Sequence, residues 1–531
     1  MQTILRSVLL FIFALVLFLH SDAQTQKYWV SFKNKDTAEY NFQTNLSKQT
    51  IVNRTLLNIP LNQFSDVPIT NEYLNVLKQM DVEVIARSKW LNAVTAYLTS
   101  GKAAEIAALP FVKSVEPVNV YLVASAKDIK VDPLLMHPAL KQMKALKFSE
   151  AGIDATGIKI GVIDAGFFKL NEDGATRYLV AEDKIRAQRD FIDPSRKDLI
   201  LTSATSSDDH GRQVVRMIAG YDTSNKAQYG MGTNASFYLA RTENGDHEYR
   251  GEEDMWIMAM EWMDSLGIRL ISTSLGYAIK MDDPNDNYVQ SEMDGKTARI
   301  TKAAQIAFEQ KGIFLVVSAG NEGDSNWRII SAPADAQGAL SVGATNAEVW
   351  DKIDYSSIGP EALPYLKPNV SCFSPNGTSF SCPAVAGFVA CLMRYDSTLT
   401  NVQLKNIMER SAHLYPYGNN FIGYGIPQAD RAMALTKNIN TDFGTAHLVH
   451  CAKKKYILTL DKPITREAVV FHKKNETIVV NIPFYKRKIM YLLNQQTLLI
   501  KKGKLKIIKP KGVARTTVAV DANMTVEIIW E

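Results

Sequence analysis

Between residues 150 and 437 the hydrophobic positions follow two alternating patterns. Residues 158–163 form a nearly continuous apolar run, which is typical of a parallel strand buried on both faces. From Glu253 to Leu266 apolar residues recur at helical spacing, and Gly267 supplies a C-terminal stop. A strand at 269–272, a helix at 298–310 and a strand at 313–317 continue the alternation. The pattern predicts βαβ crossovers and an α/β fold with a parallel sheet flanked by helices.

The preceding segment, residues 28–123, has a different order of patterns. Residues 28–32 and 90–98 alternate like half-buried strands, a helical stretch covers 101–109, and a short strand follows at 112–115. Helical stretches separate the strands, and the order of strand, helix, strand, helix and strand predicts a compact α+β unit of about 95 residues, a size that can fold alone.

Beyond about Thr436 the chain changes to short alternating strands, such as 456–460 and 477–482, with turns at Lys502-Gly503 and Lys511-Gly512. We expect a small all-β domain here. Residues 440–531 carry 17 Lys or Arg against 7 Asp or Glu, although the whole chain has a net charge of only +5. Such a basic segment favours polysaccharide, lipid headgroups or nucleic acid, but a solvated face is the simpler interpretation.

The first residues resemble a secretory signal peptide. Arg6 precedes an apolar run from Val8 to Leu19, and Ser21-Asp22-Ala23 offers small residues for cleavage after Ala23. The run is shorter than the ~20 residues needed to cross a bilayer, and no longer run occurs elsewhere. We therefore predict a secreted protein (extracellular, periplasmic or at the cell surface) with no transmembrane segment after signal removal.

The cysteines and acidic clusters suggest no metal chemistry. Four cysteines, at 372, 382, 391 and 451, allow three disulfide pairings in an exported chain, and buried thiols are the alternative. Asp282, Asp283 and Asp286 could hold a structural calcium ion, but they match no complete ligand loop, so a solvated acidic loop is favoured.

Three segments place a reactive side chain where a parallel sheet presents its ligands, at strand carboxyl ends or helix starts. Asp164 ends the strand 158–163, and a carboxylate held there can orient a histidine. His210 begins a helix and is followed directly by Gly211. Ser379 lies in Asn-Gly-Thr-Ser-Phe-Ser-Cys-Pro, before an apolar helix in which we expect Pro383 to occupy the first turn. Each segment alone also fits a helix cap or a structural residue.

Together, in the order Asp, His, Ser, these segments resemble the subtilisin-like serine peptidases, family S8. The resemblance covers about residues 152–431, and the serine motif is its most specific part. It implies a catalytic triad of Asp164, His210 and Ser379. Ser318-Ala319-Gly320-Asn321-Glu322-Gly323 is similar to the family's oxyanion motif, which implies that Asn321 donates to the oxyanion. Ser274, Leu275 and Gly276 look like the backbone strip that pairs with substrate.

The resemblance also implies a domain organisation and a set of partners. We expect a signal peptide at 1–23, a ferredoxin-like inhibitory propeptide at 24–125, a subtilisin-like catalytic domain at 126–437 and a β-rich domain at 438–531. The implied function is a serine endopeptidase that acts through an acyl-enzyme and is matured by propeptide removal. Its partners would be protein or peptide substrates and its own propeptide, with no nucleic acid, and the chemistry requires no cofactor.

Three departures from the family pattern concern residues beside the reacting groups: Arg212 follows His-Gly where threonine is usual, Ala165 replaces a hydroxyl residue, and Asn369 replaces a common aspartate. They affect substrate preference and local stability rather than reaction class. Two alternatives remain: a noncatalytic binding protein on the same scaffold, and a dedicated processing protease with few substrates. The N-terminal unit could also be a permanent interaction domain.

Overall fold

The computed structural model describes residues 25–38, 40–118, 137–205, 207–245, 251–279, 287–461, 466–480, 482–486, 489–493 and 495–531. The signal peptide predicted at 1–23 and the acidic residues Asp282, Asp283 and Asp286 lie outside these ranges, as does part of the connection between the predicted propeptide and catalytic domain.

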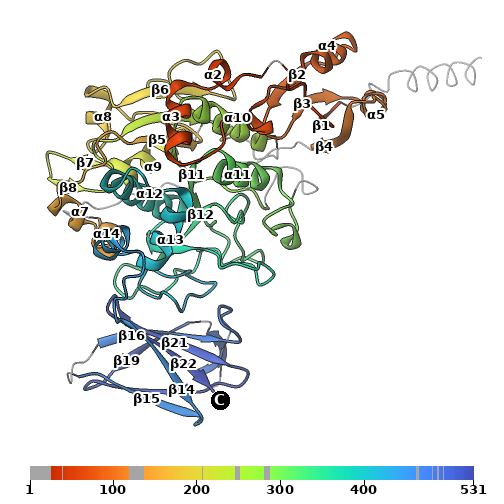
Figure 1. Cartoon of the computed structure of the whole chain (residues 1–531). Helices are drawn as coiled ribbons and strands as arrows, with labels where there is room; N and C mark the ends of the chain where they lie inside the picture. The colour runs from red at the N-terminus through yellow and green to blue at the C-terminus, as the bar shows by residue number, and fades with distance from the viewer. Residues whose placement is uncertain are drawn as a thin grey trace, which may run out of the picture.

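The domain that the sequence predicts to be catalytic is built on a seven-stranded parallel sheet with the strand order β13-β12-β11-β10-β5-β9-β6 (Figure 1). Its strands are β5 (Lys159–Asp164), β6 (Ile185–Asp190), β9 (Ser236–Arg241), β10 (Leu270–Thr273), β11 (Phe314–Ser318), β12 (Leu340–Thr345) and β13 (Val370–Phe373). The helices are α6 (Pro138–Gln142), α7 (Leu146–Glu150), α8 (Arg177–Ala181), α9 (His210–Ala219), α10 (Glu252–Ser265), α11 (Arg299–Gln310), α12 (Thr378–Tyr395), α13 (Asn401–Ser411) and α14 (Ala429–Lys437). Short strands β7 (Tyr221–Asp222) and β8 (Ala227–Gln228) form a separate hairpin. The predicted α/β architecture is confirmed.

Two hydrophobic cores cover the two faces of this sheet. One includes α9 and α12 with side chains such as Val214 and Val389, and the other includes α10 and α11 with Trp256 and Ala303. Gly267 and Gly312, which follow α10 and α11, have positive φ angles of 69° each, a conformation that glycine adopts without strain. The two glycines therefore end their helices as the sequence pattern predicted.

The N-terminal unit is an antiparallel four-stranded sheet in the order β2-β3-β1-β4. It comprises β1 (Gln26–Phe32), α2 (Phe42–Asn45), α3 (Lys48–Leu56), η1 (Phe64–Asp66), α4 (Asn71–Gln79), β2 (Val84–Ser88), β3 (Ala93–Leu98), α5 (Ser100–Ala107) and β4 (Val112–Val118). The α+β character is confirmed. The sequence pattern missed β2, and it predicted one helix between residues 32 and 90, where the structure has α2, α3 and α4. Trp29, Trp90, Ala93 and Val118 of this unit join the core cluster that contains α10 and α11.

The C-terminal domain is a β structure at one end of the molecule (Figure 1). Its strands are β14 (Ala446–Cys451), β15 (Lys455–Thr459), β16 (Arg466–Lys473), β17 (Ile482–Lys486), β18 (Ile489–Leu493), β19 (Gln496–Ile500), β20 (Lys504–Ile508), β21 (Arg515–Asp521) and β22 (Met524–Trp530). Five of them form the sheet β14-β22-β21-β16-β19, and β15 and β20 form a two-stranded ribbon whose inner side chains share its core. The prediction of a strand at 477–482 is wrong, because residues 477–480 make only an isolated bridge, at Val479.

Within the described residues, no helix is both long and apolar enough to cross a membrane.

Candidate active site

Asp164 and His210 meet at the carboxyl end of the central strand β5. Asp164 is the last residue of β5 and is fully buried, and His210 is the first residue of α9. The His210 Nδ1 and Asp164 Oδ1 atoms are 2.7 Å apart, which is a short hydrogen bond. The Ala165 amide also donates to Asp164 Oδ1, at 2.8 Å. The carboxylate can therefore fix the orientation of the imidazole.

Two glycines allow the loops that carry these residues to approach closely. A Cβ atom on Gly211 would lie 2.3 Å from the carbonyl oxygen of Gly166, and one on Gly166 would lie 2.6 Å from the Asp208 Cα atom. Both distances are shorter than any normal contact. The glycine that follows His210 is thus required by the packing that holds His210 against Asp164.

Ser379 lies at the second position of α12, after Gly377, whose φ of +91° favours glycine. The first four amides of a helix have no intrahelical acceptor, so the Ser379 amide is available to a ligand. Pro383 is the sixth residue of α12, so the prediction that it occupies the first turn is wrong. Because proline has no N–H, the carbonyl of Ser379 lacks its usual helical donor. The hydroxyl of Ser274 donates to that carbonyl instead, at 2.8 Å.

The side-chain amide of Asn321 is oriented by Thr378. The Thr378 backbone amide and hydroxyl both donate to Asn321 Oδ1, at 2.8 and 3.0 Å. The oxygen of the same hydroxyl accepts a hydrogen bond from the Gly320 amide at 3.1 Å, so the hydroxyl proton is directed at Asn321 Oδ1. Since a backbone N–H can only donate, Oδ1 must face Thr378 and Nδ2 is left to donate elsewhere. Asn321 Nδ2 lies beside Gly377, 3.3 Å from where a Cβ atom of that residue would be.

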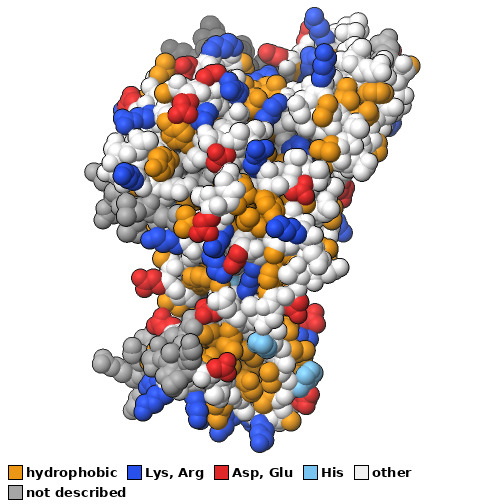
Figure 2. Space-filling model, turned by 60° about the vertical axis from the view of Figure 1, so that its left-hand side comes forward, with side chains coloured by type: hydrophobic (Ala, Val, Ile, Leu, Met, Phe, Trp, Pro, Cys, Tyr) orange, Lys and Arg blue, Asp and Glu red, His pale blue; other side chains and the backbone are white. Residues whose placement is uncertain are grey.

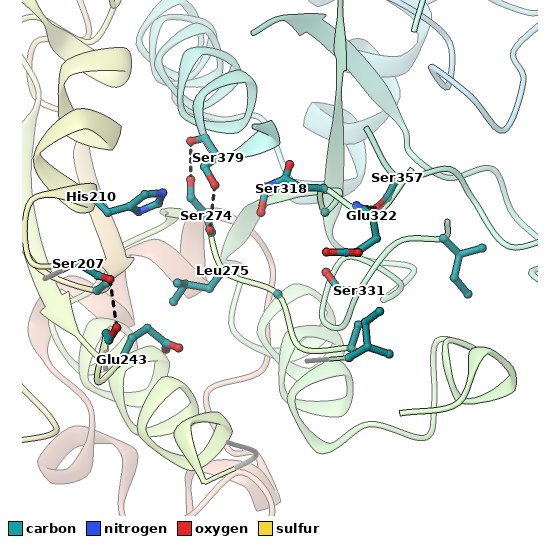
Figure 3. Close-up of a pocket in the computed structure, with 18 of the residues that line it drawn as sticks. Ser207, His210, Glu243, Ser274, Leu275, Ser318, Glu322, Ser331, Ser357 and Ser379 are labelled. Atoms are coloured by element: carbon teal, nitrogen blue, oxygen red, sulfur yellow. Dashed lines mark hydrogen bonds between the residues drawn. The ribbon is translucent and has the colours of Figure 1, made fainter. Parts of the chain in front are cut away.

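These residues line one cleft of about 280 Å³. Its wall includes the predicted site residues His210, Ser274, Leu275, Gly276, Asn321 and Ser379, while Asp164 lies buried behind His210. In Figure 3 the His210 ring and the Ser379 side chain point into the same space, with residues 274 and 275 beneath them. The Ser379 hydroxyl lies 3.4 Å from the carbonyl oxygen of Ser274, a weak contact that leaves it able to turn towards a ligand.

The charge around His210 favours its protonated form. Burial by itself lowers the pKa of the imidazole, but the negative charge and hydrogen bond of Asp164 outweigh it, with smaller contributions from Asp209 and Glu243. The net effect raises the pKa of His210 above the ordinary 6.5. A histidine of this kind is well suited to accept a proton from a neighbouring hydroxyl.

Glu243 is a cleft residue that the sequence analysis missed. It comes two residues after β9, and the hydroxyls of Tyr277 and Thr242 donate to its Oε1 atom at 2.7 and 2.8 Å. Burial raises the pKa of Glu243. Its position beyond the carboxyl end of a parallel strand is the signal that could have found it. Three further serines, which the sequence analysis did not name, also line the cleft, namely Ser207, Ser331 and Ser357, together with Ser318 of the predicted oxyanion motif.

The departures from the family pattern are accommodated without disturbing the site. Arg212 pairs with Asp173 at 3.0 Å and with Asp209 at 2.9 Å. Asn369 accepts from the Ser341 amide at 2.9 Å and donates to Glu409 at 2.8 Å. Arg212 therefore braces the start of α9 through local ion pairs.

The cysteines are free thiols, and the described part of the chain contains no cluster of three or more His, Cys, Asp or Glu suited to a metal ion. Cys372, Cys382 and Cys391 are fully buried, and burial raises the pKa of each thiol, that of Cys382 to about 12. They contribute to the hydrophobic core rather than to disulfides.

Two family models match the chain. The model of the Subtilase family matches residues 155–425, and that of the Peptidase S8 propeptide domain, Bacteroidota, matches residues 27–130. Subtilisin NAT from Bacillus subtilis subsp. natto is 26% identical over 357 residues, which are 65% of this chain and 82% of that protein. Subtilisin DY from Bacillus licheniformis is 26% identical over 280 residues, covering 51% of this chain and 89% of that protein.

A solved structure supports the same fold. The epidermin leader peptide processing serine protease from Staphylococcus aureus superposes with a TM-score of 0.54 at 13% identity, covering 77% of this chain and 99% of that one. At this identity the likeness concerns the fold alone.

Proposed function

Because the chain belongs to the Subtilase family of serine endopeptidases and carries its propeptide domain, we propose that it cleaves peptide bonds through Asp164, His210 and Ser379. The observation that carries the proposal is the 2.7 Å bond between His210 and the buried Asp164, in a cleft that Ser379 also lines. A buried carboxylate that orients a histidine beside a helix-terminal serine is an arrangement suited to acyl transfer.

In the proposed reaction the Ser379 hydroxyl attacks the substrate carbonyl carbon, and His210 Nε2 accepts the hydroxyl proton. Asp164 holds the proton of Nδ1 in place and stabilises the imidazolium that forms. His210 then gives its proton to the leaving amine, which leaves an acyl-enzyme on Ser379. A water molecule, deprotonated by His210, attacks the ester and releases the acid product.

The negative charge that develops on the carbonyl oxygen needs donors placed in advance. Asn321 Nδ2, left free to donate by the bonds of Thr378 to Oδ1, and the Ser379 amide are the two donors we propose. Substrate would lie extended along residues 274–276, where Gly276 is exposed and can offer its backbone.

We further propose that the protein is exported and that the domain limits are 1–23, 24–125, 126–437 and 438–531. Maturation would remove the propeptide by cleavage between residues 124 and 149. Protein or peptide substrates and the released propeptide are then its partners, and the catalytic groups require no cofactor.

The test compares the wild-type chain with Ser379→Ala, expressed side by side. Propeptide release is followed by intact mass, and the active serine is labelled with a fluorophosphonate probe. We expect only the wild type to be labelled and processed. Equal processing of both proteins with no labelling of either would contradict the proposal, because another protease would then remove the propeptide and Ser379 would not be activated.

A further inference from the structure

The outer face of the β15–β20 ribbon combines positive charge with exposed aliphatic side chains. The antiparallel register pairs Lys455 with Ile508, Ile457 with Lys506, and Thr459 with Lys504. Alternate residues of the ribbon, Leu458, Leu505 and Ile507, are buried in the core of the domain. The six paired side chains are all exposed, so they form one outward face, here called the lysine face.

More lysines border this face. The stretches 453–461 and 501–511 contain nine lysines and a single acidic residue, Asp461, which lies beyond the end of β15. Eight of the nine lysines are exposed, and Lys509 is half-buried. Figure 1 places β15 at the far end of the molecule from the catalytic sheet, and Figure 2 shows Lys and Arg side chains along that end. The concentrated charge therefore lies at the end of the molecule that is farthest from the catalytic sheet.

The isoleucines distinguish this face from a merely solvated one. Ile457 is 48% exposed and Ile508 is 57% exposed, and each sits opposite a lysine on the neighbouring strand. Solubility requires the lysines but gains nothing from exposed isoleucines between them. Aliphatic side chains ringed by lysines match the boundary of an anionic bilayer, where lysines meet headgroups and apolar groups enter the acyl region.

We propose that the lysine face docks the protein on a membrane surface that carries anionic lipid headgroups. This interaction goes beyond the proposed peptidase function and does not depend on it. Because β15 lies at the far end of the molecule from the catalytic sheet, docking there would leave the catalytic domain outside the bilayer (Figure 1).

The size of the effect follows from the number of charges. Each lysine near an anionic bilayer contributes roughly a fivefold factor to partitioning, so removing three should weaken binding on the order of a hundredfold. Replacing both isoleucines by serine should weaken binding on the order of tenfold. High salt, about 1 M, should abolish most of the attraction because it shortens the screening length.

The experiment uses the full chain with Ser379→Ala, which prevents self-cleavage, and measures co-sedimentation with vesicles of phosphatidylcholine alone or mixed with phosphatidylglycerol. The charge variant is Lys455→Gln/Lys504→Gln/Lys506→Gln. A matched control, Lys169→Gln/Lys197→Gln/Lys226→Gln, removes the same charge from exposed positions of the catalytic domain. Unchanged thermal unfolding verifies that each variant is folded.

We expect binding to the mixed vesicles only. Binding should weaken on the order of a hundredfold in the charge variant and on the order of tenfold in Ile457→Ser/Ile508→Ser, and it should be unchanged in the control. Absence of binding to the mixed vesicles by the Ser379→Ala chain would overturn the proposal. Equal loss in both lysine triples would also overturn it, since net charge alone would then be responsible. Binding to soluble heparin without binding to vesicles would overturn the proposal, because the lysine face would then bind a polysaccharide rather than a bilayer.

Discussion

The contact between the propeptide and the catalytic domain includes a cluster of four buried charged side chains, and removing one of them should weaken the binding of the propeptide. Arg54 of α3 and Asp66 of η1 belong to the propeptide, while Asp264 of α10 and Lys311, just after α11, belong to the catalytic domain. Arg54 lies 2.5 Å from Asp66 and 3.3 Å from Asp264, and Lys311 lies 2.8 Å from Asp66. The four charges sum to zero.

The variant Arg54→Met keeps most of the side-chain volume but leaves two carboxylates with one ammonium. Removing one partner of a buried ion pair typically costs ~3–5 kcal/mol. Because Asp66 and Lys311 remain paired, we take the lower end, about 3 kcal/mol, which corresponds to roughly a hundredfold weaker complex. The cleaved propeptide should therefore leave its enzyme at much higher concentrations than in the wild type.

The affinity of the propeptide for the enzyme can be measured from the fraction of enzyme that stays inhibited, or latent, when the complex is diluted. Processed wild type and variant are diluted in series, and the fraction of Ser379 open to a fluorophosphonate is determined at each concentration. Arg186→Met is the control, because Arg186 pairs with Asp183 on the surface and such pairs contribute little. The double variant Arg54→Met/Asp264→Leu restores neutrality and should recover most of the latency. If Arg54→Met stays as latent as Arg186→Met, the reasoning from buried charge is refuted.

The pH provides an independent check on the same interface. Burial raises the pKa of Glu261 and of Asp264, both on α10 and both covered by the propeptide. A carboxyl whose pKa is raised in the complex binds its proton more tightly there than in the free enzyme. The contribution of Glu261 and Asp264 to the stability of the complex is thus complete below the ordinary carboxyl pKa, and it is lost as the pH rises through their raised pKa values. Latency should weaken as the pH rises through this range, and the dilution series repeated at several pH values tests this.

Four further predictions concern the catalytic groups and the thiols. Asn321→Ala should lower kcat by ~10²–10³ without unfolding the protein, measured on a peptide substrate with thermal unfolding as the check, and unchanged turnover would exclude Asn321 as a donor. The acid limb of the kcat/KM profile should lie above pH 6.5, because only neutral His210 accepts a proton and its pKa is raised. Asp164→Asn should move that limb to lower pH and reduce kcat by about 10⁴, and an unshifted limb would show that another group titrates. In the native protein only Cys451 should react quickly with iodoacetamide, with all four thiols reacting after denaturation, as mass spectrometry would show.

The local sequence was sufficient to predict where a residue lies when its position depends on its immediate neighbours. Asp164 ends β5, His210 begins α9 and Ser379 is the second residue of α12. The hydrophobic pattern of each of these elements is strong, so both the element and the position of the side chain could be predicted. The same holds for Gly267 and Gly312, which end helices of clear periodicity. Pro383 was misplaced because helix starts depend on cap geometry, and α12 begins one residue before Ser379.

Contacts between distant segments could not be predicted. Arg54 and Asp264 are separated by 210 positions, and Ser274 and Ser379 by 105. No periodicity in either segment reveals its partner. The helix α10 does carry a local hint, since Asp254, Glu261 and Asp264 interrupt an apolar pattern at spacings of seven and three, which places them on one face. That face is where Lys27, Ser88 and Arg54 of the propeptide make their contacts.

Charges at this interface suit the proposed role of the propeptide, that of an inhibitor that is later removed. Apolar side chains of the same volume in place of a buried ion cluster often hold an interface as tightly or more tightly, because no charge has to be stripped of water. In the proposed maturation, by contrast, Asp264, Lys311 and Glu261 would regain water when the propeptide departs, which offsets part of the cost of separation. The same charges penalise any incorrectly seated propeptide, which would bury a carboxylate without its cation. The charged cluster therefore lowers the affinity of the propeptide but favours its correct placement and its release. The proposed role as a removable inhibitor requires both of these properties.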